Sequence, residues 1–186
     1  MHSLFRDEQR KILGWIWDST VEEAEATYRH LYEQHRALML YQSDLGLPLP
    51  KISLLTAEVA LNLGLRRAAE QEELAIGLIQ RLISEAQREN VPLDRPALSF
   101  AYQKMVEERA KAWLFQPGKI ALLERLAAAV TLVNSLPFEV ALWKVQNGYE
   151  RLKQEGLPVF ADRDDQLQWM DRFTELGEKL TFGSSI

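Results

Sequence analysis

The side chains that could do chemistry are few in this sequence of 186 residues. It contains no cysteine and three histidines, which excludes thiol nucleophiles, disulfides and metal sites built on thiolates. His30 and His35 are five residues apart, so on a helix their side chains point about 140° apart and cannot share one metal ion. The spacings typical of zinc proteases, di-iron bundles, phosphate-binding loops and serine hydrolases are missing. We therefore predict no catalytic residue, no metal site and no cofactor.

Two polar residues interrupt an apolar segment. Glu58 is the one charged residue between Ile52 and Leu65, and Asn62 follows four residues later on the same helical face. The favoured interpretation of Glu58 is an ordinary surface acid at the wet edge of a helix. Two alternatives stay open: a buried carboxylate paired with an arginine, and a functional carboxylate with a perturbed pKa facing a pocket.

The histidine most suggestive of a role is His35, because it lies among the apolar residues of the first predicted helix. A catalytic base needs a nucleophile or a substrate group beside it, and the sequence identifies neither. The favoured interpretation is therefore a hydrogen-bonded histidine in the core or in an interface.

A third group combines an aromatic ring with amides and carboxylates. Its members recur at helical spacing, opposite an apolar stripe: Glu139, Trp143, Gln146, Asn147 and Glu150. An exposed tryptophan in such company is suited to docking another protein domain or to stacking on a sugar. The favoured interpretation is nevertheless that this helix is buried on both sides and the group is structural.

The elements that position these residues are helices. All seven prolines fall between apolar segments, and proline interrupts helices because it lacks the N–H donor and clashes with the preceding turn. The segments between them are rich in strong helix formers, and none alternates as a strand does. We predict an all-α fold, a single multi-helix bundle of about seven helices with a long first helix. The predicted helices cover about 4–45, 50–65, 71–90, a fourth starting from a cap at Asp94, 119–134, a sixth starting from a cap at Ser135, and 164–180.

The first predicted helix carries a stripe at three-and-four spacing, as in an amphipathic helix that packs against a core. Its residues are Leu13, Ile16, Trp17, Val21, Ala24, Tyr28, Leu31, His35 and Leu38. Ser19 and Glu22 form a potential capping box, which would break this helix and restart it. The last predicted helix has an inward stripe of Leu167, Met170, Phe173 and Leu176, and we expect the tail 182–186 to fray.

Length and composition favour one soluble domain over 1–186. The formal net charge of −5 argues against a nucleic-acid partner or a general anionic-membrane surface. The N-terminus lacks the apolar core of a signal peptide, and no apolar run approaches the ~20 residues of a membrane span. We expect a cytoplasmic protein.

Several motifs in order resemble one known family. They are SLFRDEQRKIL, EATYRHLYEQHRALM, DLGLPLP, AEVALNLGLRRA, SLPFEVALWKVQNGYERL and FTELGEKL. Together, over about 4–180, they resemble the C-terminal helical region of bacterial alpha-amylase/alpha-mannosidase-like proteins of glycoside hydrolase family 57, a domain of unknown function. The resemblance implies a separate N-terminal barrel that carries a Glu nucleophile and an Asp acid/base. No part of that barrel is in this chain, so no catalytic residue transfers to it.

Three functions follow from these observations. The first is a non-catalytic accessory domain in carbohydrate metabolism that packs against a glycoside-hydrolase-like catalytic domain; the chain would then be either a fragment of a longer protein or a stand-alone relative. The second is a stand-alone adaptor that binds another protein. The third is a module that binds an oligosaccharide through the Trp143 face. An apolar patch bared by the missing barrel would also favour a homodimer.

Overall fold

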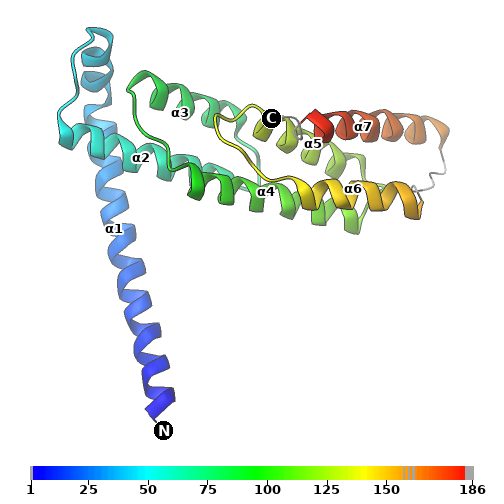
Figure 1. Cartoon of the computed structure of the whole chain (residues 1–186), viewed down its shortest axis with the longest axis horizontal. Coiled ribbons are helices and arrows are strands. Elements are labelled where there is room, and N and C mark those ends of the chain that lie inside the picture. Colours follow the sequence, from blue (N-terminus) through cyan, green and yellow to red (C-terminus); the bar gives the residue numbers. More distant parts are fainter. Residues whose placement is uncertain (1, 157, 159, 161, 183–186) are drawn as a thin grey trace. The chain divides into compact units, whose positions relative to one another are not determined.

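The protein is all-α, as the sequence predicts. The computed structural model describes the backbone of residues 2–156, 158, 160 and 162–182, and the side chains of 8–17, 19–156, 158, 160 and 162–181. These residues form seven α-helices and no strand (Figure 1). The helices are α1 (His2–Asp44), α2 (Lys51–Glu70), α3 (Ile76–Arg88), α4 (Arg95–Phe115), α5 (Ile120–Asn134), α6 (Trp143–Glu155) and α7 (Arg163–Phe182).

The chain divides into two compact units. Unit 1 comprises Met1–Leu65 and Gly77–Leu93, and unit 2 comprises Arg66–Ile76 and Asp94–Ile186. The division falls within α2, whose last five residues belong to unit 2. The single domain over 1–186 stays a prediction.

Unit 1 is built where α1, α2 and α3 meet. Its core combines two large side chains of α1, Tyr32 and Met39, with small side chains of α2 and α3 such as Ala57 and Ala86. Small residues let the helix backbones approach, so the long side chains of α1 fill the space between them. Further residues of this core are Ala60, Leu61 and Val91, with Leu49, Leu54, Leu82 and Leu93 packed around them.

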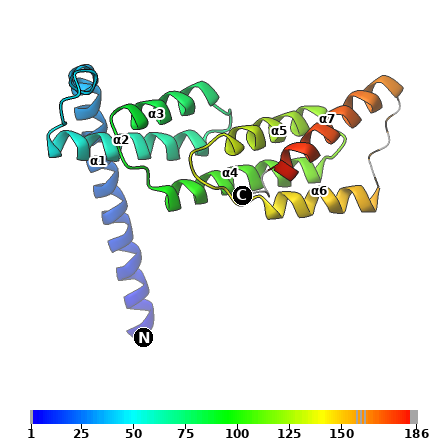
Figure 2. The same ribbon diagram turned by 45° about the horizontal axis from the view of Figure 1, so that its top comes forward.

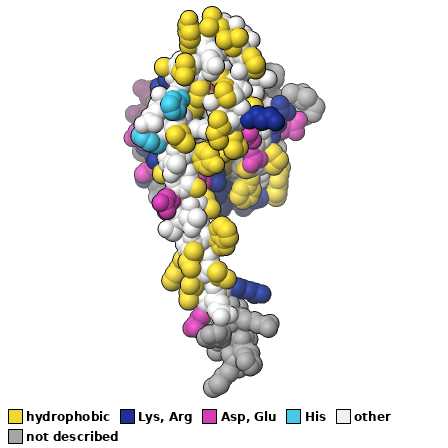
Figure 3. Space-filling model, turned by 90° about the vertical axis from the view of Figure 1, so that its left-hand side faces the viewer, with side chains coloured by type: hydrophobic (Ala, Val, Ile, Leu, Met, Phe, Trp, Pro, Cys, Tyr) yellow, Lys and Arg dark blue, Asp and Glu magenta, His cyan; other side chains and the backbone are white. Residues whose placement is uncertain are grey.

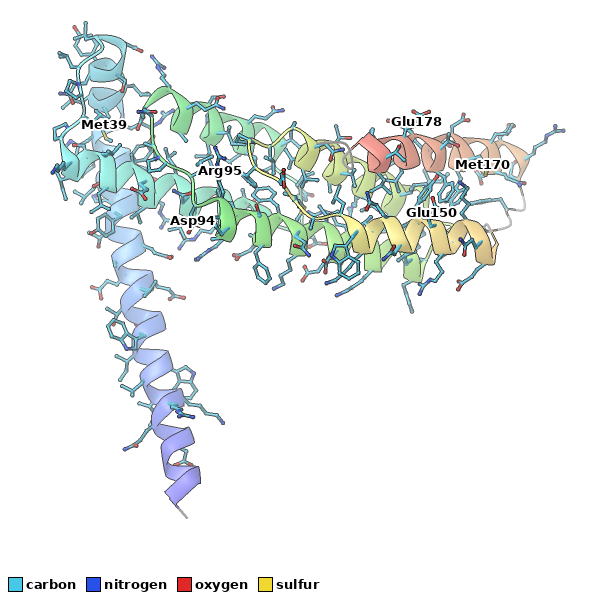
Figure 4. All side chains as sticks on the ribbon, viewed as in Figure 1. Met39, Asp94, Arg95, Glu150, Met170 and Glu178 are labelled. Atoms are coloured by element: carbon cyan, nitrogen blue, oxygen red, sulfur yellow. The ribbon has the colours of Figure 1, made fainter. Side chains whose placement is uncertain are left out.

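Unit 2 is a bundle of the last four helices. Helix α5 packs against α4 and α7, and α6 packs against α4 (Figure 2). Asp94 caps α4 as predicted: its Oδ1 accepts from the backbone N–H of Ala97 at 3.2 Å, and Pro96 stands in the first turn, where a missing N–H costs nothing (Figure 4).

Aromatic rings fill the centre of unit 2. Phe173 of α7 stacks on Tyr149 of α6 at 4.2 Å and on Trp169 at 4.8 Å between ring centroids, and Trp113 of α4 lies 6.1 Å away. The Trp169 indole donates to the carbonyl of Pro117 at 2.7 Å, which satisfies its polar atom inside the core. The predicted inward stripe of α7 is therefore only partly right. Phe173 and Leu176 are buried as predicted, but Leu167 and Met170 are exposed, and Trp169 is buried instead.

The start of the sixth helix is wrong in the sequence prediction. Ser135 does not cap it, because its hydroxyl donates to the carbonyl of Leu132 at 2.7 Å and so closes α5 instead. The segment from 136 to 142 is not helical, and Phe138 and Leu142 within it are buried. Helix α6 begins only at Trp143.

Four other predictions about the helices change. Helix α1 runs through Ser19 without the break that the potential capping box suggested. Helix α2 continues to Glu70 because Arg66–Ala69 are good helix formers, and α3 starts later, at Ile76. Helix α7 includes Phe182, so the predicted fraying of 182–186 is wrong for Phe182, and 183–186 lie outside the described residues.

A close approach between α6 and α7 makes the first testable prediction. A Cβ added at Gly177 would lie 2.3 Å from the Tyr149 hydroxyl oxygen, whereas one added at Gly77 of α3 would meet nothing within 4 Å. We expect Gly177→Ala to lower the free energy of unfolding by about 2 kcal/mol through overpacking. Gly77→Ala should raise it by about 0.5 kcal/mol, since alanine costs less backbone entropy in a helix. Chemical denaturation measures the free energy of unfolding of both variants. Equal values for Gly177→Ala and Gly77→Ala would contradict the close approach of α6 and α7.

Candidate functional site

The most unusual surface of the protein is the apolar stripe of α1. The nine residues predicted from the sequence to form it, here called the α1 stripe, run from Leu13 to Leu38 and are exposed, apart from half-buried Tyr28. Trp17 is 66% exposed and Leu38 59%. Figure 3 shows apolar side chains along the projecting part of α1. The expectation that this stripe faces the core is therefore wrong.

The reason lies in which side of α1 the rest of unit 1 occupies. Tyr32 and Met39 are 5% and 2% exposed and mark the packed side. At 100° per residue this side is centred roughly a quarter of a turn from the α1 stripe. Helix α1 thus has two apolar sides, and its own chain covers one. His35 belongs to the uncovered side and is exposed, so it is not a core histidine.

Four polar side chains, here called the acid cluster, fix the packed side: Tyr32 and Arg36 of α1, with Glu85 and Glu89 at the end of α3. The Tyr32 hydroxyl lies 3.1 Å from Glu89 Oε1 and 3.3 Å from Glu85 Oε2. Arg36 donates to both oxygens of Glu85, from Nε at 3.1 Å and from Nη2. Arg88 pairs in the same way with Asp44, near the end of α1.

The acid cluster has one hydroxyl proton for two carboxylates. Tyr32 can donate to Glu85 or to Glu89, but not fully to both. Glu89 is 4% exposed, and its Oε2 has no hydrogen-bond partner. Burial raises the pKa of Glu89 above its ordinary value; the hydrogen bond from Tyr32 lowers it in part, and the nearby charge of Glu85 raises it further. When Glu89 is protonated, it can donate to the Tyr32 oxygen while Tyr32 donates to Glu85. Each of the two short contacts then contains one proton, and Arg36 balances the charge of Glu85.

Burial is also the first cause that raises the pKa of Tyr32, followed by the charges of Glu89 and Glu85. The hydrogen bond to Glu85 raises the pKa of Arg36. The tyrosine therefore stays neutral and the arginine charged, so neither acts as a base near neutral pH. The cluster holds α1 to α3 and presents no nucleophile.

The predicted pair on α2 does not form such a cluster. Glu58 is half-buried, which lies between the surface acid and the buried carboxylate of the sequence interpretations. Asn62 Nδ2 donates to the carbonyls of Glu58 at 2.8 Å and Pro92 at 3.0 Å. Asn62 therefore ties α2 to the segment that follows α3, which is a structural contact.

The Trp143 face of unit 2 is partly as predicted. Trp143 is 55% exposed and Asn147 is exposed, so α6 is not buried on both sides. The Gln146 amide donates to the carbonyl of Leu180 at 2.8 Å, which commits it to packing α6 on α7. Glu139 precedes the helix, and its carbonyl accepts from Ser99 at 2.6 Å.

Charge on this face comes from α4 and α6. The Lys144 ammonium lies 5.5 Å from the centroid of the Trp143 ring and 2.8 Å from Glu107 Oε2. Lys144 first, then Gln103, lowers the pKa of Glu107 through hydrogen bonds. Trp143 is therefore an exposed ring with a fixed cation beside it.

Polar and charged side chains line one cavity in each unit. The cavity of about 370 Å³ lies beside the α1–α2 turn and is lined by Leu47, Leu54, Arg88, Glu89 and Asn90, among others. The cavity of about 380 Å³ in unit 2 is lined by Glu70, Glu72, Glu108, Arg109 and Arg125, among others, and Arg109 Nη2 donates to the carbonyls of Gln71 and Glu72 at 3.2 and 3.1 Å. Within the described ranges, no three acidic or histidine side chains gather closely enough to hold a metal ion. Nor is any helix there long and apolar enough to cross a membrane.

Sequence reasoning did not find the acid cluster. Its signal is two (i, i+4) pairs, Tyr32 with Arg36 and Glu85 with Glu89, each on one face of its helix. Each pair is readable alone, but nothing in the sequence says that α1 and α3 bring them together.

The pKa of Glu89 makes a second prediction. Because the folded protein holds this proton to higher pH than the unfolded chain, its stabilising effect is complete below the ordinary glutamate pKa of about 4.3 and is lost as pH rises through the raised value. Above the raised pKa of Glu89, we expect the free energy of unfolding of Glu89→Gln, relative to that of the wild type, to be about 1 kcal/mol higher than it is at low pH. Denaturation across pH measures this, with exposed Glu33→Gln as the control. Parallel pH profiles for Glu89→Gln and wild type would contradict it.

Comparisons with known proteins add no relative. No family model, no curated protein and no solved structure matches the chain. The resemblance to the helical region of family 57 glycoside hydrolases therefore stays a prediction from the motifs.

Proposed function

We propose that this chain is a non-catalytic α-helical domain that works by protein association. The observation that carries the proposal is the exposed α1 stripe, which includes Trp17, Leu31 and Leu38. Monomeric proteins rarely expose contiguous apolar patches beyond a few hundred Å², and larger ones mark interaction sites. Trp17 of the stripe is 66% exposed, and tryptophan is enriched among residues that anchor interfaces.

The length of α1 supports the same function. Its first half, residues 8–24, carries exposed side chains apart from half-buried Gly14, where side chains are described. An isolated helix of this length is marginal in water, because most helix stability comes from packing an apolar side. A partner protein on the α1 stripe supplies that packing.

For the partner, the resemblance implies a glycoside-hydrolase-like catalytic domain in the same or another polypeptide. The Trp143 face of unit 2 suits such a contact, since Trp143 is an exposed aromatic ring bordered by the Lys144–Glu107 pair. A sugar-binding role for this face has less support. The Gln146 amide is engaged with Leu180, and Glu139 lies outside the helix.

The third prediction tests association through the α1 stripe. The double variant Val21→Gln/Leu31→Gln changes two exposed residues, so it should alter the free energy of unfolding by less than about 0.5 kcal/mol. In extracts of the cells that make the protein, gel filtration should place the wild type above 21.4 kDa and the variant near it. Exposed Glu33→Gln serves as the control. A variant that elutes with the wild type would overturn the proposal.

The fourth prediction concerns chemistry. The pure chain should not hydrolyse α-glucans, because Glu85 is paired with Arg36 and Glu89 lies against the Tyr32 hydroxyl, so the acid cluster does not place two free carboxylates on either side of a substrate. Reducing-sugar release measures this. Turnover that follows the protein through two purification steps, and that Glu58→Gln abolishes, would show an enzyme instead.

A further inference from the structure

Seven of the nine residues of the α1 stripe have the period of a coiled coil. They fall at positions d and a of three consecutive heptads, in the order d, a, d, a, d, a, d, and are Trp17, Val21, Ala24, Tyr28, Leu31, His35 and Leu38. Leu13 and Ile16 fall at positions g and c, outside this seam. A period of 3.5 residues keeps a seam facing one partner helix rather than a broad core. The surface therefore fits a helix.

The sizes along the seam favour an antiparallel second copy. If two α1 helices cross at residue 26, Ala24 faces Tyr28, Val21 faces Leu31, and Trp17 faces His35 of the other copy. The end layer sets Gly14 against Leu38. Each layer then joins a larger with a smaller side chain, so the distance between helices stays even. A parallel pair would stack Trp17 on Trp17 and Ala24 on Ala24, which leaves alternate clashes and gaps.

The packing of unit 1 leaves room for this neighbour. Tyr32 and Met39, which α2 and α3 cover, occupy position e, beside the seam and not in it. A helix on the seam and the helices on the packed side are separated by about a quarter of a turn around α1, as in a bundle. In the antiparallel arrangement, the exposed first half of each α1 lies along the second half of the other α1. That second half already packs against α2 and α3 of its own copy.

The residues beside the seam distinguish this pairing from one held by ion pairs. Position g holds the uncharged residues Thr20, Thr27 and Gln34, and position e holds Glu25 close to the two-fold axis. No pair of opposite charges therefore faces across the seam near its centre. Association through apolar layers should not weaken as salt rises, whereas association through ion pairs should.

We infer that two copies of this chain pair through their α1 stripes, antiparallel and centred at residue 26. The inference rests on the proposed function and names its partner. The seam from Gly14 to Leu38 is about 37 Å long at 1.5 Å per residue. Such a contact is at the small end of specific interfaces, so we expect a reversible dimer with a Kd on the order of 10 µM.

Analytical ultracentrifugation of the full chain, from about 1 to about 300 µM, tests the pairing. The wild type should pass from monomer to dimer, with a Kd that does not rise at higher salt. Leu31→Gln should weaken the dimer at least about tenfold, because a buried amide costs free energy. His35→Leu should tighten it about tenfold, and Glu33→Gln at the outer position f should leave it unchanged. Since these residues are exposed, circular dichroism should show an unchanged fold.

The absence of cysteine allows a direct test of orientation. Thr27→Cys lies on one flank near the two-fold axis, so under mild oxidation it should form a disulfide with its own copy only in the antiparallel pair. Leu31→Cys meets its own copy only in a parallel pair, because the antiparallel arrangement separates the two by about 15 Å along the axis. Dimer from Leu31→Cys and none from Thr27→Cys would overturn the inference.

A wild type that stays monomeric at every concentration would also overturn it. The proposed function would still stand if Val21→Gln/Leu31→Gln released the chain from its assembly in cell extracts, since another protein would then occupy the stripe. If neither experiment showed association, both proposals would fail.

Discussion

The contact between Tyr32 and the end of α3 determines which side of α1 is exposed. Tyr32 is buried, and its hydroxyl lies between the carboxylates of Glu85 and Glu89. A buried hydroxyl needs its partners in place, so α1 cannot rotate about its axis without leaving these groups unsatisfied. Arg36 on Glu85 and Arg88 on Asp44 hold the same helix at two further points. With this side fixed inward, the α1 stripe must face outward.

Unit 2 solves its packing differently. Its core depends on stacked rings, with Phe173 between Tyr149 and Trp169, and on glycines where helices approach closely. A Cβ at Gly148 would lie 2.7 Å from Leu114, so the backbone of α6 comes near α4 there. Such a core is specified by shape. Unit 1 instead relies on a polar cluster that specifies one orientation of one helix.

Much of this fold could be predicted from the sequence. Proline positions and helix formers gave the helical segments, and Asp94 and Asn134 marked true helix ends. The predicted cap at Ser135 was wrong because a serine that follows a helix can end that helix as well as begin the next one. The choice depends on whether Phe138 and Leu142 are buried outside a helix, which tertiary packing decides.

The candidate site was harder to predict for a related reason. Three-and-four spacing finds an apolar stripe but does not say what covers it. On α1 the sequence offers two sides, and the one with more apolar residues is the exposed one. The packed side is identified by Tyr32, Arg36 and Met39 only once Glu85 and Glu89 are known to face it.

The composition of the α1 stripe argues for a contact that opens and closes. A permanent helical interface is dominated by large aliphatic residues, as a core is. This stripe mixes Leu31 and Leu38 with the small Ala24 and with Tyr28 and His35, whose rings carry polar atoms that water can reach. These residues lower the cost of exposing the stripe when the proposed partner is absent, at the expense of affinity. Because the acid cluster holds α1 from the other side, unit 1 can keep its fold whether or not the proposed partner is bound.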